Sequence, residues 1–297
     1  MKIRQNCSVG KHLIEINLAM ILISTSGTFG RYIAMEATTT IWLRAALAAI
    51  LLFVYCRLRG FSLKIQSRKD FAVIAIGAVL LGAHWVFYFM SLQMTNVAIG
   101  MLTLFTFPLF ATLLEPIFYQ TGWSVRQLLS CGMILIGLYI LVPSTDIDGS
   151  YLNGILLGLL SALCFTLRNL VLKPQTSRYQ GSVIMAFQLA ILAVTMIPLQ
   201  LEADLSQSLN FIWPLLFLAL FTTVIGHTMF LASFRYFSIA TASILASLQP
   251  VYGILIALVF LGEVPTGNSL IGGALILGTV VVSSMGSLSN KEVPSEK

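Results

Sequence analysis

The stretch that decides the fold runs from Asn96 to Glu115 and reads NVAIGMLTLFTFPLFATLLE. It is about as long as a membrane-spanning helix, for which roughly 20 apolar residues suffice. Pro108 interrupts the segment, and Glu115 places an acid where a charge is costly. A related pattern, SIATASILASLQPVYGILIALVFLGE, returns from Ser238 to Glu263. The sequence thus predicts two similar membrane helices, each containing a proline.

The composition of the whole chain is that of a membrane protein. Of its 297 residues, 58% are hydrophobic and 9% are charged, whereas soluble domains carry about 25% charged residues. Runs of about 20 apolar residues recur along the chain, which favours helices over barrel strands. The net charge of +6 comes from short gaps between apolar segments, so we expect no nucleic-acid partner. The 4 cysteines show no CxxC spacing, which indicates neither a disulfide framework nor a metal site.

Ten apolar segments separated by Gly, Pro or charged residues are predicted to span the membrane. They cover residues 13–34, 38–56, 71–90, 97–119, 125–143, 152–172, 182–201, 211–231, 239–261 and 268–286. We therefore expect an all-α integral membrane protein without an extramembrane domain. Residues 1–12 and 287–297 are expected to form tails.

The positions of Lys and Arg predict the orientation. With the N-terminus in the cytoplasm, 14 of the 17 basic residues fall in cytoplasmic segments, as the positive-inside rule requires. The other three, Arg31, Arg44 and Arg168, lie within predicted helices. We expect a multi-pass protein of the cell membrane, specifically a bacterial inner membrane, with both termini in the cytoplasm.

The two proline-containing segments predict an internal repeat, because an offset of 142 residues also aligns other positions. Each half, residues 13–143 and residues 152–286, contains five predicted helices, an odd number, so the second half must enter the membrane with opposite polarity. Such inverted repeats are typical of carriers that open alternately to either side. Residues matched at or near this offset are Pro108 with Pro250, Asn96 with Ser238, Trp85 with His227, and Arg44 with Gln188.

Two long motifs carry a resemblance to a known family. They are AHWVFYFMSLQMTNVAIGMLTLFTFPLFATLLEP in the first half and SFRYFSIATASILASLQPVYGILIALVFLGE in the second. With the ten predicted spans, they resemble the EamA-type transporters of the drug/metabolite transporter superfamily. The resemblance implies an inverted-repeat carrier of ten helices that moves small organic metabolites, often amino acids or related compounds. It also implies a central cavity surrounded by helices 1, 3, 4, 6, 8 and 9. The first half departs from the pattern, because Thr121 stands where Glu263 stands in the second.

Polar and aromatic residues on the cavity helices are candidates for contact with a substrate. His84 and Tyr88 share a face of one helix, with Trp85 beside them. We expect this face to point inward, where the side chains either line the cavity or fill the bundle. His227 either couples the substrate to protons or bonds to a neighbouring hydroxyl. The predicted cavity residues are Thr28, His84, Trp85, Tyr88, Thr103, Thr106, Phe165, His227, Phe230, Ser247, Gln249 and Tyr252.

Pro108 and Pro250 are predicted hinges, because each proline removes one backbone hydrogen bond from its helix. A kink used only for packing is the alternative. Glycines in the fifth and tenth helices are expected to permit close helix contacts. They are Gly132, Gly137, Gly272, Gly273 and Gly278.

Charged residues inside the predicted helices are candidates for gates. Glu115 and Arg168 fall at similar predicted depths near the cytoplasmic side. Two opposite charges at one depth are expected to pair or to face water, either as an inner gate or as a structural ion pair. Arg31, Glu36 and Arg44 form the predicted outer cluster.

No catalytic pattern is visible in the sequence. The histidines His12, His84 and His227 are far apart, and no phosphate-binding loop or metal-ligand spacing occurs. We therefore expect no enzymatic activity and no cofactor. The predicted function is a secondary carrier, in the direction of export, that acts as a monomer in the lipid bilayer on a small-molecule substrate. The alternatives are an uncoupled, channel-like facilitator and a membrane-embedded transferase; the substrate and proton coupling stay open.

Overall fold

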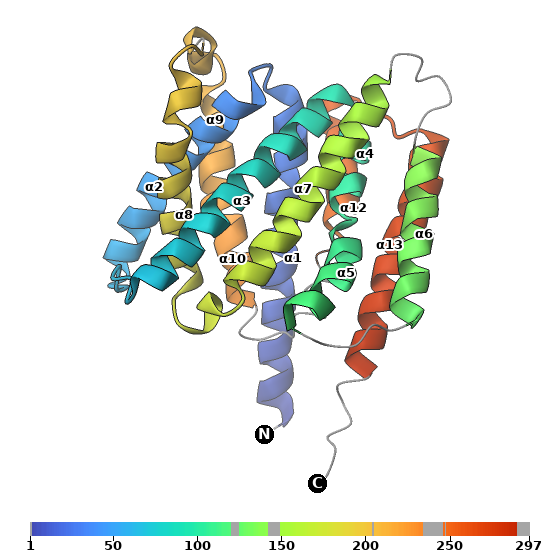
Figure 1. Cartoon of the computed structure of the whole chain (residues 1–297), viewed down its shortest axis with the longest axis horizontal. Helices are drawn as coiled ribbons and strands as arrows, with labels where there is room; N and C mark the ends of the chain where they lie inside the picture. The colour runs from blue at the N-terminus through green and yellow to red at the C-terminus, as the bar shows by residue number, and fades with distance from the viewer. Residues whose placement is uncertain are drawn as a thin grey trace.

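The computed structural model shows a bundle of helices in which the start of α1 and the end of α13 lie at the same end of the molecule (Figure 1). No strand occurs among the residues that the structure describes. Those residues are 2–119, 125–141, 149–203, 205–233, 246 and 248–289.

The helices follow the predicted apolar segments along the chain. The first half contains α1 (Lys2–Tyr32), α2 (Ala37–Leu58), α3 (Arg68–Met94), α4 (Val97–Leu104), α5 (Phe107–Tyr119) and α6 (Val125–Leu141). The second half contains α7 (Ser150–Leu172), α8 (Gly181–Thr195), α9 (Ile212–Phe217), η4 (Leu218–His227), α10 (Thr228–Ser233), α12 (Gln249–Leu261) and α13 (Gly267–Ser289). Three short 3₁₀ segments, η1 (Gln175–Ser177), η2 (Ile197–Gln200) and η3 (Ser206–Leu209), lie in the connections. The all-α prediction is confirmed.

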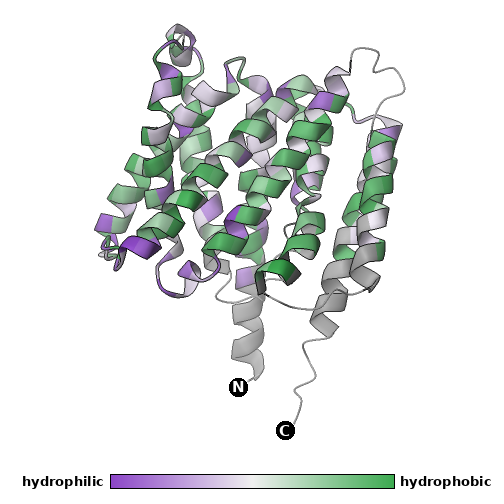
Figure 2. Cartoon of the chain, viewed as in Figure 1, coloured by the Kyte–Doolittle hydropathy of each residue, from purple (hydrophilic) through white to green (hydrophobic). Residues whose placement is uncertain are grey.

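Length and composition allow several of these helices to cross a bilayer. Within the described part of the chain, four stretches are long and apolar enough: Ala37–Leu58, Arg68–Met94, Ser150–Leu172 and Ile212–Phe230. Apolar residues colour most of the bundle, whereas many hydrophilic residues lie towards the helix ends and connections (Figure 2). Shorter apolar helices are Val97–Ala111, Gly132–Leu141, Gly181–Thr195, Gln249–Leu261 and Gly267–Thr279.

Helices of the two halves pack against each other throughout the bundle. The α3 helix packs along α7, α2 packs along α8, and α1 contacts η4, α10 and α12. The α6 and α13 helices form a separate pair at one side (Figure 1). A large buried apolar cluster accordingly combines Leu52, Phe89 and Met101 of the first half with Leu189 and Leu218 of the second. The halves therefore share one core.

Glycine allows α6 and α13 to approach closely. A Cβ atom on Gly272 would lie 2.7 Å from the backbone oxygen of Gly137, and one on Gly273 would lie 2.9 Å from Leu102 of α4. The predicted close contacts are therefore confirmed at these three glycines. In the described part of the chain, a Cβ atom on Gly132 or on Gly278 would have no neighbouring atom within 4 Å, so the prediction of a close contact is wrong for these two glycines.

Both prolines sit at the same place in their helices. Pro108 is the second residue of α5, and Pro250 is the second residue of α12. The first-turn N–H groups of a helix have no intrahelical partner, so proline is tolerated there without loss of a bond. The interruption in the first half thus precedes the proline, between the end of α4 at Leu104 and the start of α5 at Phe107. A hinge at either proline stays a prediction.

Candidate functional site

A buried arginine lies at the contact between the two halves. The side chain of Arg44, on α2, is 0% exposed. Its Nε donates to Thr223 Oγ1 at 2.8 Å, and its Nη1 donates to Ser26 Oγ at 3.1 Å. Its guanidinium carbon lies 4.0 Å from the centroid of the Trp85 ring, a cation–π contact. Among the side chains that the structure describes, none of its partners is an acid.

A π-helix presents the hydroxyl that Arg44 uses. The ten-residue segment η4 is a π-helix, a rare conformation that occurs frequently at functional sites. Thr223 Oγ1 donates its proton to the backbone oxygen of Leu218 at 2.8 Å, so a lone pair remains to accept from Arg44. The neighbouring Thr222 Oγ1 lies 3.0 Å from Thr25 Oγ1 of α1. Hydroxyl contacts therefore join α1, α2 and η4.

Aromatic residues of α3 complete this region. The Trp85 ring contacts both Arg44 and His227, and the ring centroid of His227 is 5.9 Å from that of Trp85. One turn further, a Cβ atom on Gly27 would lie 3.1 Å from Tyr88 Oη, so the phenol end reaches α1. Tyr88 is 4% exposed and Trp85 is 2% exposed. These predicted cavity residues are thus buried between helices rather than facing lipid.

Three buried polar atoms of this region have no hydrogen-bond partner in the described part of the chain. They are Arg44 Nη2, Tyr88 Oη and Thr28 Oγ1. Buried polar groups are nearly always satisfied, so each exception needs an explanation. We define Arg44, Thr28, Tyr88, Trp85 and Thr223 as the central polar site.

A second buried arginine lies in the second half. Arg168 Nη2, on α7, donates to Gln188 Oε1 of α8 at 2.7 Å and lies 3.7 Å from Met185 Sδ. Its Nη1 donates to Asn169 Oδ1 at 3.3 Å. Gln188 is the residue that the repeat alignment matches with Arg44, so both aligned positions carry a buried polar side chain. The predicted pairing of Arg168 with Glu115 is not tested, since the Glu115 side chain lies outside the described residues.

His84 joins α3 to α7. Ser161 Oγ donates to the backbone oxygen of His84 at 2.9 Å, and His84 Nδ1 lies 2.8 Å from the same Oγ. Because that hydroxyl proton is used, His84 Nδ1 carries a proton and donates it. The ring of Phe165 lies 4.9 Å from His84 and 5.3 Å from Phe107, measured between centroids. His84 and Phe165 thus lie at the contact between α3 and α7, and their predicted place in the cavity lining stays a prediction.

The threonines of the interrupted helix bond to their own backbone. Thr103 Oγ1 donates to Ile99 O at 2.9 Å, and Thr106 Oγ1 donates to Thr103 O at 2.7 Å. Both residues are 0% exposed. A Cβ atom on Gly158 of α7 would collide with Thr103 Oγ1, so α4 is pressed against α7 at this point.

The remaining cavity predictions lie near α1 and α12. Tyr252 Oη donates to Asn17 Oδ1 at 3.1 Å, and the backbone oxygen of Gln249 accepts from Ser24 Oγ at 2.9 Å. Phe230 packs against a small apolar cluster of α1. The predicted residue Ser247 lies outside the described residues.

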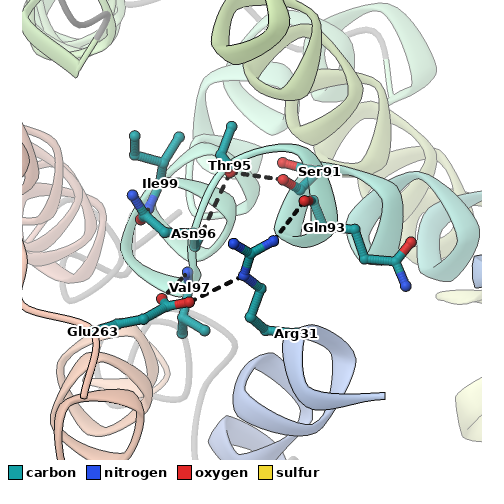
Figure 3. Close-up of polar contacts among 8 residues, drawn as sticks. All are labelled: Arg31, Ser91, Gln93, Thr95, Asn96, Val97, Ile99 and Glu263. Carbon is teal, nitrogen blue, oxygen red and sulfur yellow. Dashed lines mark hydrogen bonds and ion pairs between the residues drawn. The ribbon is translucent and has the colours of Figure 1, made fainter. Parts of the chain in front are cut away.

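An ion pair joins α1 to the end of α12 at one end of the bundle. Arg31, at the end of α1, donates from Nε to Glu263 Oε1 at 3.1 Å and from Nη1 to the backbone oxygen of Gln93 at 2.6 Å. The other oxygen of Glu263 accepts from the backbone N–H of Val97 at 2.9 Å. Figure 3 shows Glu263 reaching from the end of α12 to the junction of α3 and α4. The side chains of Arg31 and Glu263 are 37% and 23% exposed.

The structure does not bring together the predicted outer cluster of Arg31, Glu36 and Arg44. Arg44 is buried at the central polar site, and the Glu36 carboxylate accepts from Thr38 Oγ1 at 3.4 Å. Sequence reasoning noted Glu263 as part of the family motif but did not pair it with Arg31. The two residues are separated by 232 positions, and no local pattern connects them.

A polar cluster missed by sequence reasoning lies at the other end of α3. Asp70 accepts from Tyr179 Oη at 2.8 Å, from Arg178 Nη1 at 3.2 Å and from Gln175 Nε2 at 3.2 Å. Since Asp70 and Gln93 are 23 residues apart on α3, this cluster lies about 35 Å from the Arg31–Glu263 pair along the helix axis. The signal available was Ser67, which caps α3 by accepting from the backbone N–H of Asp70.

Long apolar helices that enclose buried arginines and hydroxyls define a multi-pass membrane protein. Within the described part of the chain, no group of three or more His, Cys, Asp or Glu residues has the geometry to hold a metal ion. The EamA-like transporter family matches residues 12–142 and again residues 152–285. The chain therefore belongs to the EamA-like transporter family.

Relatives agree with this assignment over nearly the whole chain. An uncharacterized transporter of Archaeoglobus fulgidus is 26% identical over 269 residues, which cover 90% of this chain and 94% of the relative. The uncharacterized transporter YxxF of Bacillus subtilis is 24% identical over 278 residues, covering 91% and 88%. A protein of known crystal structure matches 95% of this chain and 99% of its own at a TM-score of 0.67 and 19% identity, which shows a shared fold.

Proposed function

We propose that this protein is a secondary carrier that exports small organic metabolites, such as amino acids or related compounds, by alternating access. The observation that carries the proposal is the placement of polar contacts between the halves. Arg31 of the first half binds Glu263 of the second at one end, and Asp70 of the first half binds Arg178 of the second at the other. The central polar site lies on helices between these ends. A carrier of this kind needs a contact at each end that opens in turn.

The strength of these contacts suits such a role. The Arg31–Glu263 pair is partly exposed, and such ion pairs contribute only about 0–1 kcal/mol each, because water competes for both partners. Breaking one of them is therefore a small cost compared with the apolar core that the halves share. The Asp70 cluster adds neutral hydrogen bonds from Tyr179 and Gln175, so it is the stronger of the two.

Two observations support the inverted repeat of ten helices that alternating access requires. The family matches the chain twice, once in each half. The packing is also consistent with a repeat in which α1 corresponds to α7, and α4 with α5 corresponds to α12. The α1 helix contacts α12, and α7 likewise contacts α4 and α5. Helices that correspond to each other also pack together, α2 with α8 and α6 with α13.

The placement of basic residues supports cytoplasmic termini. Arg57 lies in the last turn of α2, Arg59 and Lys64 follow that helix, and Lys173 and Arg178 follow α7. Figure 1 draws both connections at the same end as the start of α1. Under the positive-inside rule this end faces the cytoplasm. The Arg31–Glu263 pair then closes the outer end, and Glu115 with Arg168 stays the proposed inner gate.

Counterflow in proteoliposomes tests the carrier against a channel-like facilitator. Vesicles preloaded with an unlabelled amino-acid mixture are expected to accumulate labelled amino acids transiently, because a carrier returns loaded. A channel shows no such stimulation, and a transferase yields a modified product instead. Uptake into inside-out vesicles that exceeds uptake into right-side-out vesicles supports export, and the reverse contradicts it.

A reversible cross-link tests the gate at the outer end. Arg31 and Glu263 are both replaced by cysteine in a chain that lacks its native cysteines, and a cleavable dithiol reagent then joins them. Exchange is expected to stop on cross-linking and to return on reduction. The single Arg31→Cys variant with the same reagent is the control. Continued exchange by the cross-linked protein overturns the gating role.

A further inference from the structure

The central polar site contains a positive charge that no acidic side chain in the described part of the chain contacts. Arg44 is fully buried, and its partners are two hydroxyls and an aromatic ring. Burial of a charge is costly unless it is paired. Acidic residues in the described part of the chain, such as Glu263 and Asp70, are engaged at the two ends of the bundle. Among the described residues no acidic side chain compensates the charge of Arg44, so a bound anion is a candidate for that role.

The unused donors show where an anion fits. Arg44 Nη2 has no partner, although Nε and Nη1 of the same group are held in place by Thr223 and Ser26. Tyr88 Oη and Thr28 Oγ1 are also unpartnered. Ser26, Gly27 and Thr28 are consecutive residues of α1, so all three unused donors border one turn of this helix. Fixed donors without partners are a pre-organised anion site.

We propose that the transported solute carries a carboxylate, and that Arg44 Nη2 binds this group with the help of Tyr88 Oη. This inference rests on the proposed carrier function. A singly charged carboxylate matches one guanidinium, whereas phosphate, with a charge of about −1.5 to −2, leaves excess negative charge in the bundle. The rings of Trp85 and His227 beside Arg44 give the solute an apolar and aromatic surface for the rest of its body.

Arg168 does not offer an equivalent site. Both of its terminal nitrogens are engaged, Nη2 with Gln188 and Nη1 with Asn169, and only Nε is unused. Its partners all belong to the second half. Arg44 instead lies where α1, α2 and α3 of the first half meet η4 of the second. Solute sites of inverted-repeat carriers lie at such an interface.

Matched ligand pairs test the proposal on the purified full chain. Thermal unfolding is measured with phenylacetate, 4-methylpentanoate, L-phenylalanine and L-leucine, each beside its primary amide, and with inorganic phosphate. At least one acid is expected to raise the unfolding temperature, whereas its amide and phosphate do not, because the amide lacks the charge that Arg44 needs. Equal stabilisation by acid and amide, a response to phosphate alone, or no response to any acid overturns the proposal.

Variants locate the effect at Arg44. Arg44→Gln is expected to abolish the response to the acid, whereas Arg57→Gln, the same change at an exposed position of α2, retains it. If Arg44→Gln does not fold, Tyr88→Phe is used, and it is expected to weaken binding of the acid about tenfold. If Arg44→Gln folds, a retained response to the acid together with unchanged affinity in Tyr88→Phe contradicts the site. If Arg44→Gln is unfolded, unchanged affinity of Tyr88→Phe for the acid contradicts it.

Counterflow separates this proposal from the carrier function. If a neutral amide shows trans-stimulated exchange equal to that of its acid, the carrier stands and the carboxylate site is overturned. If an acid binds through Arg44 but shows no trans-stimulation, the site stands and the carrier function fails.

Discussion

Arg44 and Arg168 are both buried arginines within a helical bundle, but they belong to different kinds of contact. Arg168 binds Gln188, Asn169 and Met185, all within the second half. Arg44 belongs to the first half and binds Thr223 of the second. A movement of one half against the other therefore leaves Arg168 with these three partners, whereas it changes the contact between Arg44 and Thr223. Both arginines are buried, so the difference between them lies in the halves that their hydrogen-bond partners belong to.

The largest effect on stability is expected from the contact inside one half. Gln188→Ala removes a hydrogen bond to the charged Arg168 and also opens a cavity at a fully buried position, which together cost about 3–5 kcal/mol in the free energy of unfolding. Denaturant unfolding in detergent measures the loss, with Gln207→Ala at an exposed position as the control. If Gln188→Ala lowers the free energy of unfolding by less than about 1 kcal/mol more than the control variant does, the structural role is contradicted.

A smaller loss of stability, but a larger loss of transport, is expected at the contact between the halves. Thr223→Val removes the acceptor of Arg44 Nε, which costs about 1.5–3 kcal/mol because a hydrogen bond to a charged group is lost. Thr222→Val, which leaves the Arg44 contact in place, is the matched control. We expect initial rates of counterflow to fall at least about tenfold in Thr223→Val and to stay within about threefold of wild type in Thr222→Val. Equal counterflow rates in Thr223→Val and Thr222→Val contradict a role of the Arg44 contact in transport.

The smallest effect on stability is expected at the exposed pair. The coupling energy between Arg31→Gln and Glu263→Gln, from a double-mutant cycle, should be about 0–1 kcal/mol and should fall as salt is added. Glu202→Gln, an exposed acid after α8, serves as the control for loss of one negative charge. A coupling of several kcal/mol that does not respond to salt shows a fixed contact, which contradicts a gate.

The helices were predictable because a run of apolar residues is a local signal. The interruption near Pro108 was also visible, although the structure places the break before the proline and not at it. The alignment of Arg44 with Gln188 was made for the repeat, and both residues are buried in the structure. The periodicity of apolar residues along single helices did not predict which face points inward, because both faces of a membrane helix are apolar.

Contacts between distant segments were not predictable. Glu263 contacts Arg31, which is 232 positions away in the sequence, and Asp70 contacts Tyr179, which is 109 positions away. No local spacing indicates either pair. The contact between His84 and Ser161 across 77 positions was equally invisible, and the predicted cavity role of His84 stays a prediction. The π-helix η4 was also invisible, because its hydrogen-bond register is not written in residue types.

That register has a consequence for how the sequence tolerates changes in length. Deleting one residue from Leu218–His227 brings the segment closer to α-helical winding, in which each residue turns by about 100°. The residues after the deletion then rotate by about 100° around the helix axis relative to the residues before it. Thr222 and Thr223 therefore cannot both keep their contacts to Thr25 and Arg44 while the residues that follow also keep theirs. The contact between the halves is thus encoded by the number of residues in this helix as well as by their kinds.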